Sequence, residues 1–312
     1  MLIPAHPATL ITVLLSVLLF LLVASGIALW VQYARPMYSD KTLWLKVRTW
    51  WFIVVFLCAV LLLHHAMAML LLAALSLLTL KEYLALIALR PCDKRVLPLL
   101  YLTIPLQYYF AYQNWLVLFM AFIPVFGLLL LPVLLSAQPQ GFLRAVGSLY
   151  WGLMIAVFSL SHMAYLLVIS LPISEKYSGS TLLCFLLLLT QLNDVAQYIW
   201  GKAFGVRKMI PHISPHKTWV GFLGGIVTTV ILAYWIAPWL TPFSKMQSVL
   251  LGLLIACAGF AGDMVASALK RDVGVKDSGN LLPGHGGILD RVDSLIYTAP
   301  LYFYCVIYLL RH

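Results

Sequence analysis

The sequence has little charge. Only 10% of its 312 residues are Asp, Glu, Lys or Arg, whereas soluble domains average about 25%. Hydrophobic residues make up 63%, so the chain has too few polar side chains to cover a surface that faces water. This composition excludes a soluble globular domain and predicts an all-α polytopic integral membrane protein.

Cysteine is also scarce. The five cysteines form no C-x-x-C pair, and four of them lie in apolar runs. This pattern implies neither a disulfide framework nor a zinc site. The first apolar run also lacks a preceding basic segment and a following small-residue cleavage site, so we expect it to be a retained span rather than a cleaved signal.

Acidic residues are half as frequent as basic ones, which gives a net charge of +10. In a membrane protein such an excess reflects basic loops on one side of the bilayer. We therefore expect contact with a lipid bilayer and no nucleic-acid partner.

About ten apolar runs approach or reach the roughly 20 residues needed to cross a bilayer. The second run is short and is either re-entrant or longer than its apolar part. The predicted spans are 8–32, 50–64, 66–89, 96–111, 114–135, 147–172, 180–201, 219–241, 247–266 and 291–310.

The basic residues alternate between the predicted loops. Sixteen Lys and Arg residues fall on every second loop, and three fall on the other side. Cytoplasmic loops carry an excess of Lys and Arg. We therefore expect a bacterial inner-membrane protein with both termini outside and a polar site at the cytoplasmic membrane face.

The acidic residues concentrate in the last third of the chain. Residues 1–190 hold four of them and residues 191–312 hold six. We predict that residues 1–180 form a scaffold of lipid-facing transmembrane helices. Residues 181–312 are predicted to form a catalytic transmembrane domain with cytoplasmic loops 202–218 and 267–290.

Four aspartates lie in or beside the later spans: Asp194, Asp263, Asp290 and Asp293. A carboxylate near the hydrocarbon is costly and usually faces a cavity, a partner or a cation. Asp290 and Asp293 are spaced to share one helix face. They are candidate ligands for Mg²⁺, which prefers carboxylate, water and phosphate oxygens. Structural hydrogen bonds and complements to a helix dipole are the alternatives.

Two polar segments offer groups that suit phosphates. The stretch "PGHGG" (283–287) contains glycines that permit close backbone approach, and Ser, Lys and Thr at the expected start of span 219–241 suit an anion. Topology signals, a helix cap and a snorkelling lysine are the alternative explanations. The side chains concerned are Lys270, Arg271, Lys276, His285, Arg291, Ser214, Lys217 and Thr218.

The stretch "SALKRDVGVKDSGNLLPGHGGILDRVD" (267–293) resembles the signature of the phosphatidate cytidylyltransferases, or CDP-diacylglycerol synthases. The upstream stretch that begins at Asn193 and includes "SPHKTWVG" resembles a second block of that family. The resemblance spans roughly 190–300, and the first 180 residues match only as hydrophobic spans. The signature positions are Ser267, Lys270, Arg271, Lys276, Asp277, His285, Gly286, Gly287, Asp290, Arg291 and Asp293.

The resemblance implies that CTP and phosphatidic acid yield CDP-diacylglycerol and pyrophosphate. It also implies Mg²⁺, alone or with a second cation, and a homodimer. The implied catalytic residues are Lys270, Arg271, His285, Asp290 and Arg291. The implied substrate-binding residues are Ser214, Lys217, Thr218, Ser267, Lys276, Asp277, Gly286 and Gly287. The implied metal ligands are Asp263, Asp290 and Asp293, with Asp194 as a fourth.

The chain departs from the family pattern at three positions. His216 replaces a lysine, and Val220 and Ala266 replace two glutamates. These changes predict a divergent paralog, and they leave open a weakly active regulatory homologue or another lipid phosphate as substrate. The pattern of CDP-alcohol phosphotransferases is absent. A cation-coupled transporter would hold intramembrane aspartates but would need neither the glycine–histidine loop nor its basic residues.

Overall fold

The computed structural model describes residues 8–34, 41–135, 139–169, 176–279, 281 and 286–311. Within these ranges the chain is mainly helical and has no named strand, and an isolated β-bridge pairs Lys208 with Thr218. The predicted all-α class is confirmed. The helices are α1 (Ala8–Ala34), α2 (Lys41–Leu62), α3 (His65–Leu86), the 3₁₀ helix η2 (Pro91–Val96), α4 (Leu97–Tyr112), α5 (Leu116–Leu135), α6 (Phe142–Leu153), the π-helix η3 (Met154–Ser159), α7 (Leu160–Val168), α8 (Gly179–Phe204), α9 (Trp219–Leu240), α10 (Lys245–Asp272), α11 (Leu289–Val292) and α12 (Leu295–Arg311).

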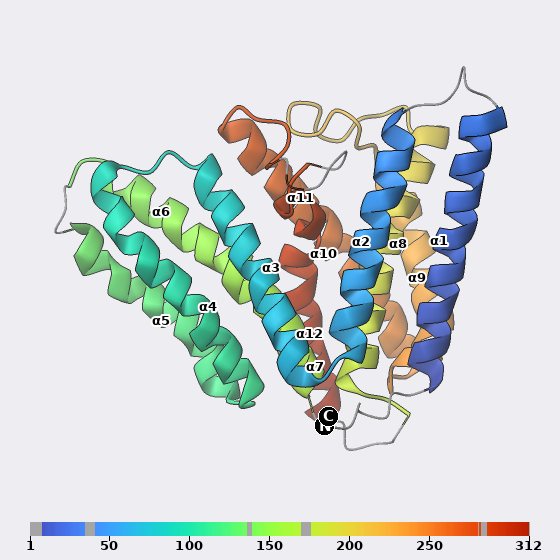
Figure 1. Ribbon diagram of the computed structural model, residues 1–312, viewed down its shortest axis with the longest axis horizontal. Coiled ribbons are helices and arrows are strands. Elements are labelled where there is room, and N and C mark those ends of the chain that lie inside the picture. Colours follow the sequence, from blue (N-terminus) through green and yellow to red (C-terminus); the bar gives the residue numbers. More distant parts are fainter. Residues whose placement is uncertain are drawn as a thin grey trace.

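The helices run side by side between two ends of the molecule (Figure 1). On one flank α4, α5 and α6 pack together, and on the other α8, α9 and α10 pack in succession, with α12 against α10. Helix α7 contacts α3, α4, α8 and α12, and so joins the two groups. Its residues Leu160 to Leu167 are buried throughout, which places the hydrophobic core of the protein around α7.

Seven helices of the described chain are long and apolar enough to cross a membrane. Helices α2 and α5 contain shorter apolar stretches, at Val47–Leu62 and Leu116–Pro132. Every predicted span coincides with a helical element. The short second run belongs to the longer helix α2, because the chain is already helical at Lys41, before the apolar part begins.

One boundary prediction is wrong. The loop expected at 267–290 begins only after Asp272, since Ala, Leu, Lys and Arg at 268–271 favour helix and the two cations suit its C-terminal end. The last span is present as Leu289–Arg311, and a turn at Asp293 and Ser294 divides it into α11 and α12. Helix α10 crosses this break closely: a Cβ on Gly262 would lie 2.4 Å from the carbonyl oxygen of Asp293.

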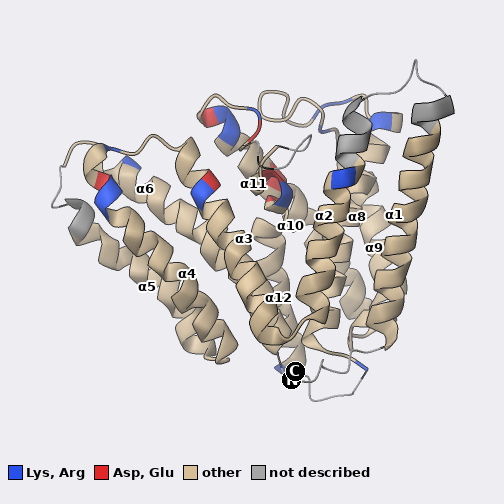
Figure 2. Cartoon of the chain, viewed as in Figure 1, with Lys and Arg blue, Asp and Glu red and all other residues tan. Residues whose placement is uncertain are grey.

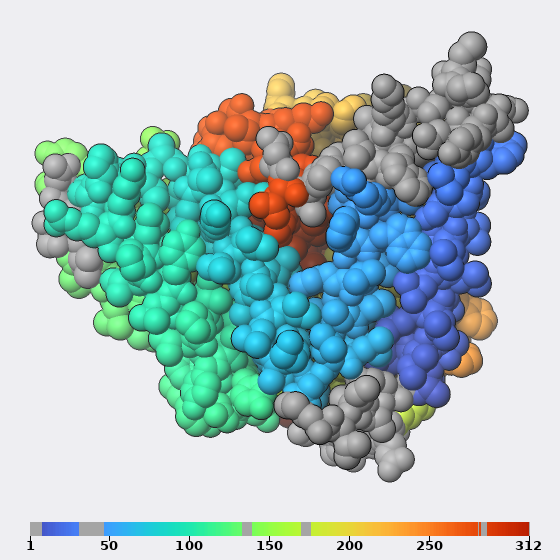
Figure 3. Space-filling model, in the orientation of Figure 1, coloured from blue at the N-terminus to red at the C-terminus, as the bar shows by residue number. Residues whose placement is uncertain are grey.

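Most Lys and Arg residues of the described chain gather at one end of the helix bundle, together with the Asp and Glu residues (Figure 2). The segments that follow α3, α8 and α10 all lie at this end (Figure 1). We call it the charged end. In the space-filling view, residues of the last third of the chain reach the surface there between α3 and α2 (Figure 3).

Two glycines of α6 provide a test of this packing. A Cβ on Gly152 would lie 2.6 Å from the ring of Tyr83 on α3, whereas a Cβ on Gly147 would meet nothing within 4 Å. Overpacking costs about 1–3 kcal/mol. We therefore expect Gly152→Ala to lower the unfolding midpoint in detergent and Gly147→Ala to leave it unchanged or raise it. Equal behaviour of the two variants would contradict the α3–α6 contact.

Candidate active site

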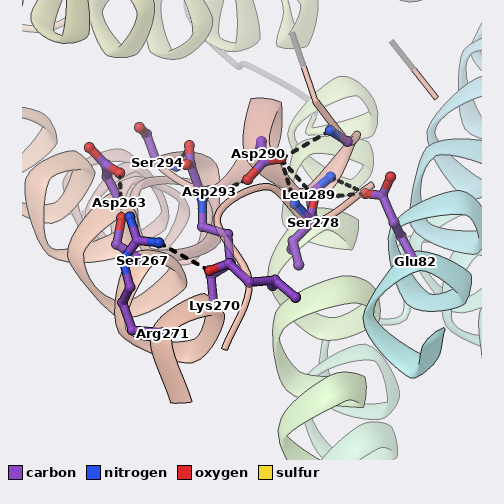
Figure 4. A network of polar contacts seen from close by, with 12 residues as sticks. Glu82, Asp263, Ser267, Lys270, Arg271, Ser278, Leu289, Asp290, Asp293 and Ser294 are labelled. Atoms are coloured by element: carbon purple, nitrogen blue, oxygen red, sulfur yellow. Dashed lines mark hydrogen bonds and ion pairs between the residues drawn. The ribbon is translucent and has the colours of Figure 1, made fainter. Parts of the chain in front are cut away.

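The polar residues of the charged end form two adjoining sets (Figure 4). The first, here called the carboxylate cluster, comprises Asp194, Asp263 and Asp293 with Lys217. The second, here called the loop anchor, comprises Asp290 with Lys270, Ser278 and Glu82, together with the backbone N–H groups that these carboxylates accept. In the first set, α8 carries Asp194, α10 carries Asp263, Asp293 lies between α11 and α12, and Lys217 lies in the loop before α9. In the second set, Glu82 lies in α3, Lys270 in α10, and Ser278 and Asp290 in the chain after α10.

The carboxylate cluster brings three acidic side chains together and contains one ion pair. Lys217 Nζ lies 2.6 Å from Asp263 Oδ2, and Asp293 feels the charges of both Asp263 and Asp194. Ser294 donates its hydroxyl to Asp194 Oδ2 over 2.8 Å. The other oxygen, Asp194 Oδ1, is buried without a hydrogen-bond partner. The cluster therefore has a surplus of negative charge and one acceptor that lacks a donor.

Lys217 reaches this cluster from the loop before α9. Its ammonium also donates to Gln197 Oε1 over 3.1 Å and lies 5.8 Å from the centre of the Phe260 ring. Burial lowers the pKa of Lys217, but the carboxylates of Asp263, Asp194 and Asp293 outweigh burial and raise that pKa above its ordinary value. Lys217 therefore stays positively charged across the physiological pH range.

The loop that carries Lys217 is fixed by backbone contacts. Thr218 Oγ1 caps α9 by accepting from Gly221 N over 3.1 Å, and Trp219 N donates to Arg207 O. The same hydroxyl packs against α8, where a Cβ on Gly205 would lie 2.4 Å from it. Thr218 thus joins the ends of α8 and α9. It is the N-cap of α9, which was the alternative explanation for this residue.

A cavity of about 590 Å³ opens beside the cluster. Asp194 and Lys217 line it, and the remaining polar groups come from the end of α8 and the following loop. A concave site with a few converging polar groups is typical of a ligand pocket. Its lining residues are Asp194, Gln197, Tyr198, Gly201, Lys202, Gly205, Lys208, His216, Lys217, Thr218, Gly221 and Phe222.

Asp290 has all the donors that a carboxylate needs. Its Oδ1 accepts from Lys270 Nζ over 2.6 Å. Its Oδ2 lies within 3.0 Å of Ser278 N, Ser278 Oγ and Gly287 N. Only 8% of the residue is exposed. In this state Asp290 holds the chain on both sides of the polar segment, and its role as a metal ligand stays a prediction.

Asp290 and Asp293 do not act as one pair on a helix face. Asp290 belongs to the loop anchor, whereas Asp293 belongs to the carboxylate cluster. The positive charge of Lys270 acts on both carboxylates. The break between α11 and α12 separates their surroundings. Lys270 lies between the two sets and is the cation that both carboxylates share.

Glu82 is a site residue that the sequence analysis missed. It comes from α3, in the part of the chain assigned to a scaffold, and its Oε2 accepts from Leu289 N over 2.7 Å and from Ser278 Oγ over 3.1 Å. Figure 4 shows its side chain pointing from α3 toward these two residues. A carboxylate inside an apolar span is the signal that could have identified it, as it did for Asp194.

The remaining predicted residues lie around these two sets. The Arg271 side chain donates to Ile213 O and Val275 O, so it ties the two polar segments together. Ser267 Oγ donates to Asp263 Oδ1 over 3.4 Å. Arg291 contributes positive charge near Asp194, and its Nε is buried without a partner.

Other predicted residues make fewer contacts. Lys276 and Asp277 are exposed, and Ser214 is half-buried in a turn before Lys217. Gly286 has φ +79°, a conformation that favours glycine. Gly287 donates its N–H to Asp290. His285 lies outside the described residues.

The positions that depart from the family pattern have different surroundings. Ala266 is buried in α10 with 3% exposed, whereas Val220 is 37% exposed on the first turn of α9. His216 lines the cavity. The loop anchor contains one acidic residue from outside the signature, Glu82.

A metal site in the carboxylate cluster stays a prediction. Among the described residues, no group of three His, Cys, Asp or Glu side chains could hold a metal ion by itself. Mg²⁺ commonly uses one or two protein carboxylates and completes its shell with water and phosphate oxygens. The unpartnered oxygen of Asp194 and the surplus negative charge match that mode of binding.

Known proteins resemble this chain over different lengths. The protein of Escherichia coli K12 described as uncharacterized protein YnbB is 44% identical over 291 residues, which are 92% of this chain and 95% of that protein. The phosphatidate cytidylyltransferase of Synechocystis is 48% identical over 120 residues, 38% of this chain and 40% of that enzyme. The Bacillus subtilis phosphatidate cytidylyltransferase is 45% identical over 128 residues, 40% of this chain and 47% of that enzyme.

The chain thus matches less than half the length of these two enzymes. The family model has wider coverage, because the model of the cytidylyltransferase family matches residues 44–309. These matches confirm the resemblance drawn from the signature. Since the family model spans most of the sequence, the chain belongs to the cytidylyltransferase family.

Proposed function

We propose that this protein transfers CMP from CTP to phosphatidic acid and releases pyrophosphate. The carboxylate cluster beside a polar cavity is the observation that carries the proposal. Lys217 and Asp194 belong to both, so a nucleotide in the cavity would reach the carboxylates with its phosphates. Membership of the cytidylyltransferase family and the similarity to phosphatidate cytidylyltransferases support this substrate pair.

The reaction is a displacement at phosphorus. A phosphate oxygen of phosphatidic acid forms a bond to the α-phosphorus of CTP. The bond from that phosphorus to the α–β bridging oxygen breaks, and pyrophosphate leaves with the electron pair. The protein has no covalent step to perform, so positioning and charge stabilisation supply the catalysis.

The residues divide this work by charge. Asp263, Asp293 and Asp194 would hold Mg²⁺, which when bound neutralises charge on phosphate oxygens. Lys217 and the basic groups of the cavity would bind phosphates of CTP. Lys270 is paired with Asp290 here, and it would exchange that partner for a phosphate oxygen once substrate is present. Asp290 keeps its two backbone donors, Ser278 N and Gly287 N, during such an exchange.

Removing one carboxylate of the cluster should abolish most activity. We expect Asp263→Asn and Asp293→Asn to lower CDP-diacylglycerol formation by at least about 100-fold, because each removes charge that holds the cation. Asp272→Asn, an exposed position on the same helix as Asp263, is the matched control. Purified protein, labelled CTP, Mg²⁺ and a panel of phosphatidic acids provide the assay. Full activity of both cluster variants would refute the assignment.

A second test of the cluster needs no turnover. Lys217→Met removes the close cation and leaves the three carboxylates without it, so we expect Mg²⁺ to raise the unfolding midpoint of this variant more than that of the wild type. Lys202→Met, which changes an exposed lysine of the same cavity, should show the wild-type response. If Mg²⁺ affects all three proteins equally, the cluster is not its site.

We further propose that the charged end faces the cytoplasm of a bacterial inner membrane, since basic residues concentrate on the cytoplasmic side. The end of α12 lies at the opposite end of the bundle (Figure 1). Alkaline phosphatase fused after α12 should therefore be active, and green fluorescent protein fused there should be dark. The opposite pair of results would invert the orientation.

A further inference from the structure

Glu82 is the residue that α3 contributes to the loop anchor. The proposed reaction assigns it no role. It lies in a span that is otherwise mostly apolar, where a carboxylate is costly. The hydrogen-bond donors that offset this cost come from the other half of the chain. Leu289 N donates to Glu82 Oε2 over 2.7 Å, at the first residue of α11.

The loop is shaped to receive this carboxylate. A Cβ on Gly279 would clash with Glu82 Oε1, and a Cβ on Gly287 would clash with both Ser278 Oγ and Glu82 Oε1. Neither position can carry a side chain while Glu82 remains where it is. Gly279 and Gly287, which come from the two sides of the loop, therefore both lie directly against the carboxylate of Glu82.

Ser278 connects Glu82 to Asp290. Its hydroxyl oxygen lies 3.1 Å from Glu82 Oε2 and 3.0 Å from Asp290 Oδ2, but a hydroxyl has one hydrogen to donate. Asp290 Oδ2 already accepts two backbone N–H groups, from Ser278 and Gly287. Glu82 Oε2 accepts only one, so we assign the hydroxyl hydrogen to Glu82.

We propose that Glu82 is a positioning residue for CMP transfer, an inference that rests on the proposed function. It clamps the loop through Ser278 and Leu289, and the loop in turn holds Asp290 and, through it, Lys270. The N-terminal helices thereby contribute to the geometry of a site whose signature lies wholly in the last third of the chain.

Substitutions at position 82 separate the clamp from a general effect on folding. Glu82→Ala removes the carboxylate oxygen that accepts both hydrogen bonds. We expect kcat/KM for CTP to fall about 10–100-fold, mainly through kcat. Glu82→Gln keeps one oxygen that can accept both hydrogen bonds and loses only the charge, so it should retain activity within about fivefold. Lys81→Ala, at the exposed neighbouring position, is the control and should match the wild type.

Hydrogen exchange tests the clamp without turnover. In Glu82→Ala, peptides containing Ser278, Gly287 and Leu289 should exchange faster than in the wild type, while Glu82→Gln and Lys81→Ala should keep their protection. If the wild type itself makes no CDP-lipid, the proposed function fails. The exchange data then decide on their own whether Glu82 holds the loop.

Three results would overturn the inference. The first is a Glu82→Ala variant with wild-type kcat/KM. The second is unchanged exchange at Leu289 in that variant. The third is a Glu82→Gln variant as inactive as Glu82→Ala despite intact protection, since a charge effect rather than the clamp would then explain the loss.

Discussion

Carboxylates near a membrane core need donors or cations, and this constraint organises the charged end of the protein. The hydrocarbon offers neither, so the acidic side chains that are withdrawn from water must find their partners inside the bundle. Asp290 and Glu82 find backbone N–H groups and a serine. Asp263 finds Lys217. The close contacts among α3, α10, α11 and α12 at this end follow from those pairings.

The two polar sets satisfy the constraint to different degrees. The loop anchor is saturated: Asp290 accepts from Lys270 and from two backbone N–H groups. The carboxylate cluster is not, because among the described residues Lys217 forms an ion pair with Asp263 alone and Asp194 keeps an unpartnered oxygen. A saturated set keeps its geometry, whereas an unsaturated set gains from an added cation. The first is therefore suited to structure and the second to substrate chemistry.

Much of this arrangement could be predicted from the sequence. Apolar runs and basic loops predicted the helices and the charged end. The sequence grouped Asp263 with Asp290 and Asp293 and added Asp194 as a fourth, whereas the structure groups Asp194, Asp263 and Asp293 and places Asp290 in the loop anchor. The partners of Asp290 could not be predicted, because they are backbone groups whose positions depend on the path of the loop. The break after α11 was hidden for a similar reason, since the three-residue spacing of Asp290 and Asp293 fits a continuous helix. Glu82 was overlooked because no signature motif surrounds it.

The glycines of the polar segment acquire a different meaning from this structure. In the sequence they indicate a loop that brings backbone N–H groups toward phosphates. In the structure, Gly279 and Gly287 leave room for a carboxylate that belongs to α3. The length of the side chain at position 82 and the absence of side chains at 279 and 287 form a single steric condition. A side chain at position 279 or 287 would require the carboxylate of Glu82 to move away from the loop.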